Sequence, residues 1–376
     1  MRVLTVNAGS TSLKLERYEL VAPLPPLAEP PVPSWSRAAK LVEAEDAIEA
    51  CTVEPLDVAA HRFVRLPDGA PAVLGLDAAA IASIAAAAPD APLHDAAALR
   101  AVACIARSKP ELPQFAVGDS AFHRSMPEAA TTYALPREVT RSGLRRLGYH
   151  GLSHEYAAHR ACSLAGIDVE TARVITAHLG GGSSLCAIRN GASLDTTMGY
   201  TPLEGLPMAT RSGSVDPGLL LHLLRTGLSH DALEEMLERR SGLLGISGIS
   251  GDVRELLSLG DRPMARLALD VLGWRLRSSL GAMVAVLGGV DLIAFTGGVG
   301  EHAAEIRAAA LEGGLGLGAA VDAKRNAAVN EGRIDADGSP VAVCVVAARE
   351  GWLLARAAFA IVTAGGSTPG VRADAP

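Results

Sequence analysis

Residues 3–14 read VLTVNAGSTSLK, and residues 173–185 read RVITAHLGGGSSL. In each stretch a short apolar strand runs into a turn of glycine and hydroxyl residues, after which a second strand begins. Two such strand–turn–strand segments, about half a chain apart, indicate an internal duplication rather than a short-period repeat. The pattern predicts two similar lobes, each opened by a β-hairpin.

Glycine and hydroxyl turns of this kind suit phosphate groups, because glycine allows a close backbone approach and successive N–H groups donate to phosphate oxygens. A third turn, at 296–301, follows an apolar run at 292–295. One turn alone is weak evidence, since tight hairpins need glycine anyway, but three after buried strands favour phosphate binding. None matches the P-loop pattern, and no dinucleotide-binding fingerprint is present.

Strand and helix patterns alternate along the rest of the chain, which predicts an α/β fold with a ligand cleft between two lobes. The proline-rich segment 22–33 should be irregular. We expect helices at 78–88, 95–106 and 350–361, and strands at 115–118, 292–295 and 341–346.

Composition excludes several classes of protein. The 376 residues are 49% hydrophobic and 20% charged, which favours a large buried core over disorder. A net charge of −7 disfavours nucleic-acid binding. Five scattered cysteines without a CxxC pair disfavour a disulfide framework or a zinc site. With no signal-peptide pattern and no apolar stretch long enough to cross a bilayer, we expect a soluble, cytoplasmic protein without a membrane partner.

Several polar residues are candidates for a catalytic or binding role, and each could instead have a purely structural role. Lys14 is a candidate phosphate ligand or a surface lysine, and Asp119 is a candidate for magnesium hydration, for steering an arginine, or for a helix N-cap. One of His150 and His154 is a candidate to meet a phosphoryl group while the other is structural, and a capping or core role is the alternative for either. Arg211 lies in the irregular run 195–213, whose length is typical of a functional loop, and a surface salt bridge is its alternative role.

Taken together, these segments resemble the acetate kinase family. The resemblance runs in order from residue 1 to beyond residue 350, and its motifs are long. They are NAGSTSLK at 7–14, GDSAFHRSMP at 118–127, GYHGLSH at 148–154, HLGGGSS at 178–184, the loop 196–213, SGLLGISG at 241–248 and FTGGVGE at 295–301.

The resemblance implies an actin-like ATPase fold of duplicated ribonuclease-H-like lobes with an active-site cleft between them, and a homodimer. Residues 1–148 would form the first lobe and residues 149–349 the second, nucleotide-binding lobe. A C-terminal helix of about residues 350–376 would pack back on the first. The implied reaction is reversible transfer of the ATP γ-phosphoryl group to acetate or another short-chain carboxylate.

The resemblance also implies roles for individual residues. Asp119 would be the active-site acid, while His150 and Arg211 would stabilise the transferring phosphoryl group. Asn7 and Glu350 would hold Mg²⁺ or Mn²⁺. Arg62 would bind the substrate carboxylate, with an acyl pocket formed by Val64, Leu93, Tyr149 and Pro202. ATP would be held by Lys14, His178, Leu179, Gly180, Gly181, Gly182, Asp252, Val253, Arg254, Gly298, Val299, Gly300, Glu301 and His302.

A carboxylic acid of pKa ~4–5 is already ionised at neutral pH, so the acceptor needs no strong base. The family assignment makes Asp119 a proton donor or acceptor, whereas this chemistry favours a carboxylate that orients magnesium or an arginine. The main difficulty is the approach of two anions, which positive charge and positioning overcome.

The chain departs from the family pattern mostly on the acyl side. Where the family continues His-Gly-Gly after its arginine motif, this chain has residues 65–69, RLPDG. Gly181 replaces an asparagine, Tyr149 replaces a phenylalanine, and Asp95-Ala96 replaces Asn-Pro. The Tyr149 hydroxyl would favour a more polar acid or simply narrow the pocket. Propionate or butyrate as acceptor, pyrophosphate as donor, and an ATP-binding regulatory protein without transfer activity therefore remain alternatives.

Overall fold

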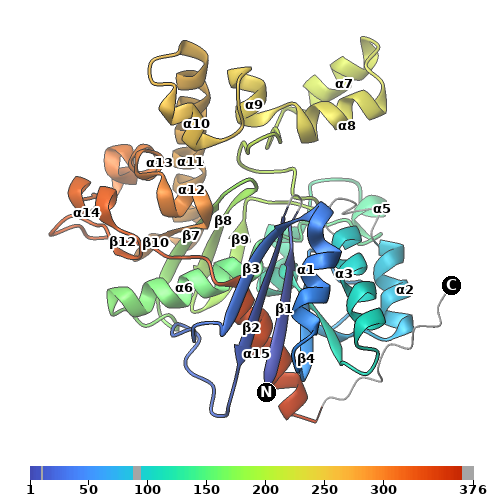
Figure 1. Ribbon diagram of the computed structural model, residues 1–376. Coiled ribbons are helices and arrows are strands. Elements are labelled where there is room, and N and C mark those ends of the chain that lie inside the picture. The colour runs from blue at the N-terminus through green and yellow to red at the C-terminus, as the bar shows by residue number, and fades with distance from the viewer. Residues whose placement is uncertain (10–11, 88–94, 366–376) are drawn as a thin grey trace. The chain divides into compact units, whose positions relative to one another are not determined.

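The computed structural model describes residues 1–9, 12–87 and 95–365. The chain divides into two compact units, one of Met1–Ala121 with Arg349–Pro376 and the other of Phe122–Ala348. Each unit contains one six-stranded sheet (Figure 1). The division falls earlier than the expected residue 148, so residues 122–148 group with the second unit. Whether each unit behaves as an independent domain stays a prediction, and residues 366–376 of the expected C-terminal helix lie outside the described residues.

The first unit is built on a sheet with strand order β3-β2-β1-β4-β6-β5. Its strands are β1 Arg2–Ala8, β2 Ser12–Glu19, β3 Trp35–Lys40, β4 Val58–Phe63, β5 Val73–Gly75 and β6 Gln114–Gly118. Its helices are η1 Leu41–Glu43, α1 Ala44–Thr52, α2 Ala78–Ala87, α3 Asp95–Ser108 and α15 Glu350–Thr363, and η3 Asp119–Ser125 begins here and runs into the second unit.

The second unit is built on a sheet with order β11-β12-β10-β7-β8-β9. Its strands are β7 Arg173–Leu179, β8 Ser183–Arg189, β9 Ala192–Thr196, β10 Leu292–Thr296, β11 Gly332–Arg333 and β12 Ala342–Val345. Its helices are α4 Glu128–Thr131, α5 Arg137–Thr140, α6 Gly151–Ala165, α7 Pro217–Arg225, α8 His230–Arg239, α9 Gly242–Ser247, α10 Val253–Ser258, α11 Pro263–Leu287, α12 Gly297–His302, α13 Ala304–Ala310, η4 Glu312–Gly316 and α14 Ala323–Ala328.

The two sheets share one pairing scheme. In the first, β1, β2 and β3 form an antiparallel meander, β1 pairs in parallel with β4, and β4 pairs in parallel with β6. In the second, β7, β8 and β9 form the meander, and parallel pairs join β7 to β10 and β10 to β12. Each sheet ends in a short antiparallel edge strand that precedes its partner in sequence. The predicted duplicated α/β fold is therefore confirmed.

Helix α15 comes after the last strand of the second unit but packs against β1 and β4 of the first (Figure 1). Trp352 on this helix is completely buried, and its indole N–H donates to the Leu27 carbonyl at 3.0 Å. In the second unit α6, which precedes β7, packs against β7 and β10. The irregular segment around Leu27, predicted from its prolines, is thereby held against the first unit.

Helix α11 supplies much of the core of the second unit. Its buried residues recur every three or four positions, which places them on one helical face. They are Ala265, Ala268, Leu272, Leu276, Leu280, Met283 and Leu287, and Gly273 is buried beside Leu272. Pro263 begins the helix, and Gly288 ends it in the left-handed conformation, φ +71°. Among the described residues, no helix is both long enough and apolar enough to span a bilayer.

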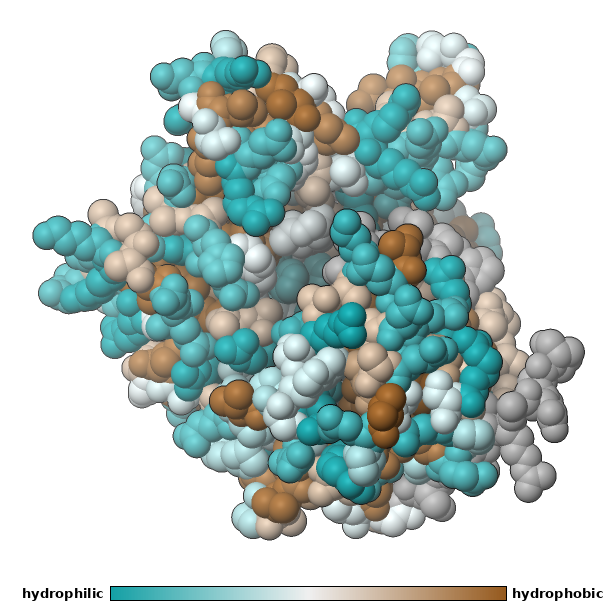
Figure 2. Space-filling model, in the orientation of Figure 1, coloured by the Kyte–Doolittle hydropathy of each residue, from teal (hydrophilic) through white to brown (hydrophobic). Residues whose placement is uncertain are grey.

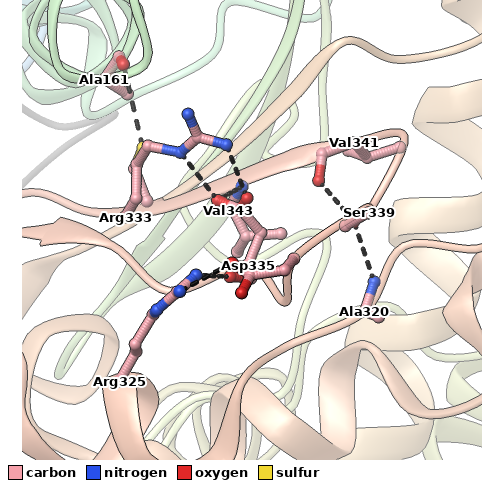
Figure 3. Close-up of polar contacts among 10 residues, drawn as sticks. Ala161, Ala320, Arg325, Arg333, Asp335, Ser339, Val341 and Val343 are labelled. Atoms are coloured by element: carbon pink, nitrogen blue, oxygen red, sulfur yellow. Dashed lines mark hydrogen bonds and ion pairs between the residues drawn. The ribbon is translucent and has the colours of Figure 1, made fainter.

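The edge of the second sheet is tied by Asp335 (Figure 3). Its carboxylate accepts from the Arg333 Nη2 at 2.7 Å and from the Val343 N–H at 3.1 Å, while Arg325 Nη1 donates to its backbone carbonyl at 2.8 Å. Cys344 Sγ lies 3.8 Å from the Ala161 carbonyl, which links β12 to α6. These contacts hold the short strand β11 against β12 despite its length of two residues.

One expected turn takes a different form. The segment 296–301 forms the end of β10 and most of a short helix, α12, rather than an open glycine turn. Gly297 permits this change of direction because its φ is +77°, and a Cβ there would stand 2.7 Å from the Leu179 carbonyl oxygen.

We predict that His61 makes the first unit sensitive to acid. The side chain is completely buried, and burial, opposed by the hydrogen bond to Gln114, lowers its pKa to about 4. The unfolded chain, with an ordinary histidine pKa of about 6.5, binds the proton more readily between these values. The free energy of unfolding should therefore fall as the pH drops from about 6.5 towards 4, by up to ~3 kcal/mol from this group.

The measurement is urea unfolding across this pH range for the wild type and for His61→Gln. The variant should lose part of the pH dependence, since its side chain does not titrate. An unchanged slope in the variant would contradict the assignment.

Candidate active site

The first unit holds a buried ion pair at the ends of two parallel strands. Arg62 lies on β4, and Asp119 follows directly after β6. Arg62 is 8% exposed, Asp119 is 0% exposed, and Nη2 of the arginine donates to Oδ2 of the aspartate at 2.7 Å. Since an unpaired charge is costly in the interior, each side chain fixes the other. The carboxylate thus orients a guanidinium, which is itself suited to binding an anion.

Asn7 and Glu350 meet at the same edge of this sheet. The Asn7 side-chain amide donates to Glu350 Oε2, and Arg62 Nη1 lies 3.5 Å from Asn7 Oδ1. Asn7 is near the end of β1, and Glu350 is the first residue of α15. One amide oxygen and one carboxylate are the donor types with which Mg²⁺ binds while it keeps several waters. These two residues therefore fit a magnesium site.

Lys14 faces Asn7 across the β1–β2 hairpin. Its ammonium pairs with Glu16 Oε1 at 2.9 Å, and the Tyr18 hydroxyl donates to the other carboxylate oxygen at 3.2 Å. Glu16 is 4% exposed. A Cβ on Gly351 would collide with this carboxylate, at 1.7 Å from Oε2, so a side chain there would displace the Glu16 carboxylate.

In the second unit, histidines and hydroxyl side chains form a connected cluster between α6 and the β7–β8 hairpin. His150 Nδ1 lies 2.8 Å from Ser184 Oγ, and the same hydroxyl lies 2.8 Å from His154 Nε2. The His150 and His178 rings stack with centroids 4.2 Å apart. Ser153 Oγ lies 2.8 Å from His178 Nδ1. His150 stands at the N-cap of α6 with a left-handed backbone, φ 57°, which is uncommon outside glycine.

His150 and Arg211 converge on Gly182. A Cβ placed on this glycine would lie 3.3 Å from His150 Nε2 and 3.7 Å from Arg211 Nη1. Arg211 is half-buried, its Nε lies 3.3 Å from Glu238 Oε2, and its Nη1 donates to the Pro202 carbonyl at 3.4 Å. The structure therefore brings the two predicted phosphoryl-stabilising side chains to the same glycine turn.

The loop that carries Arg211 is irregular from residue 197 to residue 216, as predicted. Arg146 ties its beginning, donating through Nη1 to the carbonyls of Thr196, Thr197 and Met198 and pairing with Glu204 at 2.8 Å. The loop has no regular helix or strand of its own, so these hydrogen bonds to Arg146 hold its beginning in place.

Apart from Lys14, the residues expected to hold ATP occupy three places in the second unit. The turn 178–182 approaches α12, since a Cβ on Gly180 would lie 4.0 Å from the Gly298 N–H. In α12, Glu301 Oε1 accepts from the Ala348 N–H at 3.0 Å. Asp252 caps α10 by accepting from the Arg254 N–H, and its carboxylate pairs with the Arg254 guanidinium at 2.6 Å.

Of the residues expected around the acyl group, Val64 is buried in the first unit and Pro202 is half-buried in the second. Leu93 lies outside the described residues. Tyr149 is 2% exposed, and its hydroxyl donates to the Tyr200 carbonyl. That hydroxyl therefore anchors the 197–216 loop.

Two buried polar residues were not singled out from the sequence, Glu16 and Ser184, whereas His154 was weighed together with His150. Glu16 lies two positions after Lys14 on a strand, and this spacing places both side chains on the same face. Their pairing could therefore have been predicted from the sequence. The Ser184 bridge depends on α6 lying over β8, which the sequence pattern does not specify.

The chain matches the model of the acetokinase family over residues 45–356. It is 38% identical over 405 residues to an acetate kinase of Cyanothece sp., with 96% of this chain and 98% of the relative covered. An acetate kinase of Synechococcus sp. is 47% identical over 272 residues, which cover 72% of this chain and 68% of the relative.

Solved structures agree with this assignment. The acetate kinase of Porphyromonas gingivalis superposes with a TM-score of 0.83 at 33% identity, covering 96% of this chain and 99% of that one. A propionate kinase from Francisella tularensis gives 0.82 at 30% identity, covering 94% and 98%. The fold and the site thus define a kinase-type phosphotransferase. The chain belongs to the acetokinase family.

We predict that Tyr149→Phe leaves the acid preference unchanged. Because the hydroxyl is already bonded to the Tyr200 carbonyl, it should contribute to loop order rather than to recognition of a polar acid. Rates with acetate and with glycolate should change by the same factor, and the free energy of unfolding should fall by about 1–2 kcal/mol. A selective loss of glycolate turnover would instead assign the hydroxyl to the substrate.

Proposed function

We propose that the protein transfers the γ-phosphoryl group of ATP reversibly to the carboxylate of acetate or another short-chain acid, giving an acyl phosphate and ADP. The observation that carries this proposal is the convergence of His150 and Arg211 on Gly182, in a chain that also buries Arg62 against Asp119. Family membership supports the same reaction.

The first unit would bind the acid and the metal. Arg62 binds the carboxylate through its guanidinium, and Asp119 holds that guanidinium in orientation rather than removing a proton, because the acid is ionised at neutral pH. Asn7 and Glu350 hold Mg²⁺ or Mn²⁺. When bound, the metal neutralises phosphate charge.

The second unit would bind the nucleotide and stabilise the transferring group. The turn 178–182, residues 252–254 and residues 298–302 contact ATP. Lys14 is proposed as a phosphate ligand. His150 and Arg211 donate to the phosphoryl oxygens, on which negative charge accumulates in the loose, in-line transition state.

We further propose that the protein acts in the cytoplasm as a homodimer. All five cysteines are free, which supports a reducing compartment. Large apolar side chains are exposed on α7 and α11: Leu219, Leu221, Leu224, Met264, Leu267 and Trp274. Figure 2 shows hydrophobic surface over this helical part of the second unit. Exposed apolar groups of this size are typical of an interface.

We predict that Arg211→Ala lowers turnover by ~10²-fold or more with little effect on folding, because a charge acting on the transition state is lost. Arg240→Ala, which removes an exposed arginine outside the proposed machinery, is the matched control. The measurement is acyl-phosphate formation trapped as hydroxamate. Near-wild-type activity of Arg211→Ala would remove this residue from the mechanism.

The same assay, run on the wild type with several acids and donors, tests the function itself. Product from acetate and ATP is the expected result. Product only with propionate, butyrate or pyrophosphate would redirect the assignment within the same reaction class. Absence of product despite ATP binding would indicate a regulatory protein instead.

We predict that Leu221→Glu combined with Trp274→Glu produces a monomer, because two charges would be buried at the interface. Size-exclusion chromatography with light scattering measures the mass. Val42→Glu, at a 90% exposed valine in the other unit, should leave the dimer intact. A dimer that persists in the double variant would place the interface elsewhere.

A further inference from the structure

A chain of alternating hydroxyl and imidazole groups leads from β7 to His150. Thr176 Oγ1 lies 2.7 Å from His154 Nδ1, and His154 Nε2 lies 2.8 Å from Ser184 Oγ. The same serine hydroxyl lies 2.8 Å from His150 Nδ1. Thr176, His154 and Ser184 are each 0% exposed, so bulk solvent does not reach these bonds.

The positions of the protons follow from counting donors. His154 is neutral because its burial, and then the neighbouring His123 and His178, lower its pKa well below the ordinary value. It therefore has one N–H and one lone pair, and one of its two hydroxyl partners must donate to it.

The Thr176 hydroxyl decides which one. Its contact with His154 Nδ1 is its hydrogen bond within the described part of the chain, so its proton is satisfied only if it donates to that nitrogen. His154 then carries its proton on Nε2 and donates to Ser184 Oγ. The serine in turn donates its single proton to His150 Nδ1. The opposite direction would leave the buried Thr176 proton without an acceptor.

We infer that Thr176, His154 and Ser184 are positioning residues that hold His150 as the neutral tautomer with its proton on Nε2. This nitrogen is the one directed at the Gly182 turn, 3.3 Å from the position of a Cβ on that residue. The inference deepens the proposed function. A neutral N–H donor meets the transferring phosphoryl group, and the positive charge at this turn comes from Arg211.

The surroundings of His150 oppose its protonation. Protonation at Nδ1 would place a second donor against Ser184 and leave the serine proton without its acceptor. Within the second unit, the ring stacks on His178 at 4.2 Å, its centroid lies 6.4 Å from that of His154, and Arg211 stands across Gly182. His123 lies one ring further, 5.8 Å from His154.

The test is ¹⁵N NMR of the histidine rings in the full-length protein without substrates. At neutral pH His150 should show a lone-pair shift at Nδ1 and a protonated shift at Nε2, and His154 should show the same tautomer. A proton on Nδ1 of His150, or an imidazolium at neutral pH, would overturn the inference. This readout requires no turnover, so it can fail independently of the proposed function.

Ser184→Ala removes the bridge. His150 should then become a mixture of tautomers, because its Nδ1 loses the hydroxyl that donates to it. Ser193→Ala is the matched control, because Ser193 Oγ bonds the neighbouring His123 Nδ1 at 2.9 Å and does not bond His150. Ser184→Thr keeps the hydroxyl and should restore the wild-type spectrum.

In turnover, Ser184→Ala should lower kcat about tenfold or more with little change in either KM. An activity loss in which the His150 tautomer stays as in the wild type would show a merely structural role and contradict the inference.

Discussion

Arg62 and Asp119 are buried side by side at the ends of neighbouring parallel strands, and neither charge is tolerable there without the other. The sheet supplies the geometry, because β4 and β6 run in register and end together. The pair holds a guanidinium at the edge of the first sheet, where Asn7 and Glu350 also meet. The acid-binding half of the proposed chemistry depends on this arrangement.

The duplication gives each unit the same scaffold with different groups at equivalent positions. The last polar pair of the first hairpin is Asn7 with Lys14, and that of the second is His178 with Ser184. In each unit a helix begins beside this pair, with Glu350 contacting Asn7 and Ser153 contacting His178. One hairpin therefore presents charged and amide groups suited to a metal and phosphates. The other presents imidazoles and hydroxyls in hydrogen-bond contact.

Much of the fold could be predicted from the sequence because its signals are local. The hairpin at 3–14, the helices at 78–88 and 95–106 and the long loop before Arg211 all follow from periodicity, glycine and proline. Helix α12 was missed because Gly297 supports either a turn or a helix start. The Asp119–Arg62 pairing was one of the alternatives open for that aspartate. The bridge from Ser184 to His154 was not predictable, since it joins residues 30 positions apart through helix packing.

The account assigns the acid to the first unit and the nucleotide phosphates mainly to the second, and steady-state kinetics of Arg62→Ala test this division most directly. With the acid and ATP varied in turn, the variant should show a strongly raised KM for the acid and a nearly unchanged KM for ATP. A variant whose KM for ATP rises while its KM for the acid stays at the wild-type value would contradict the account.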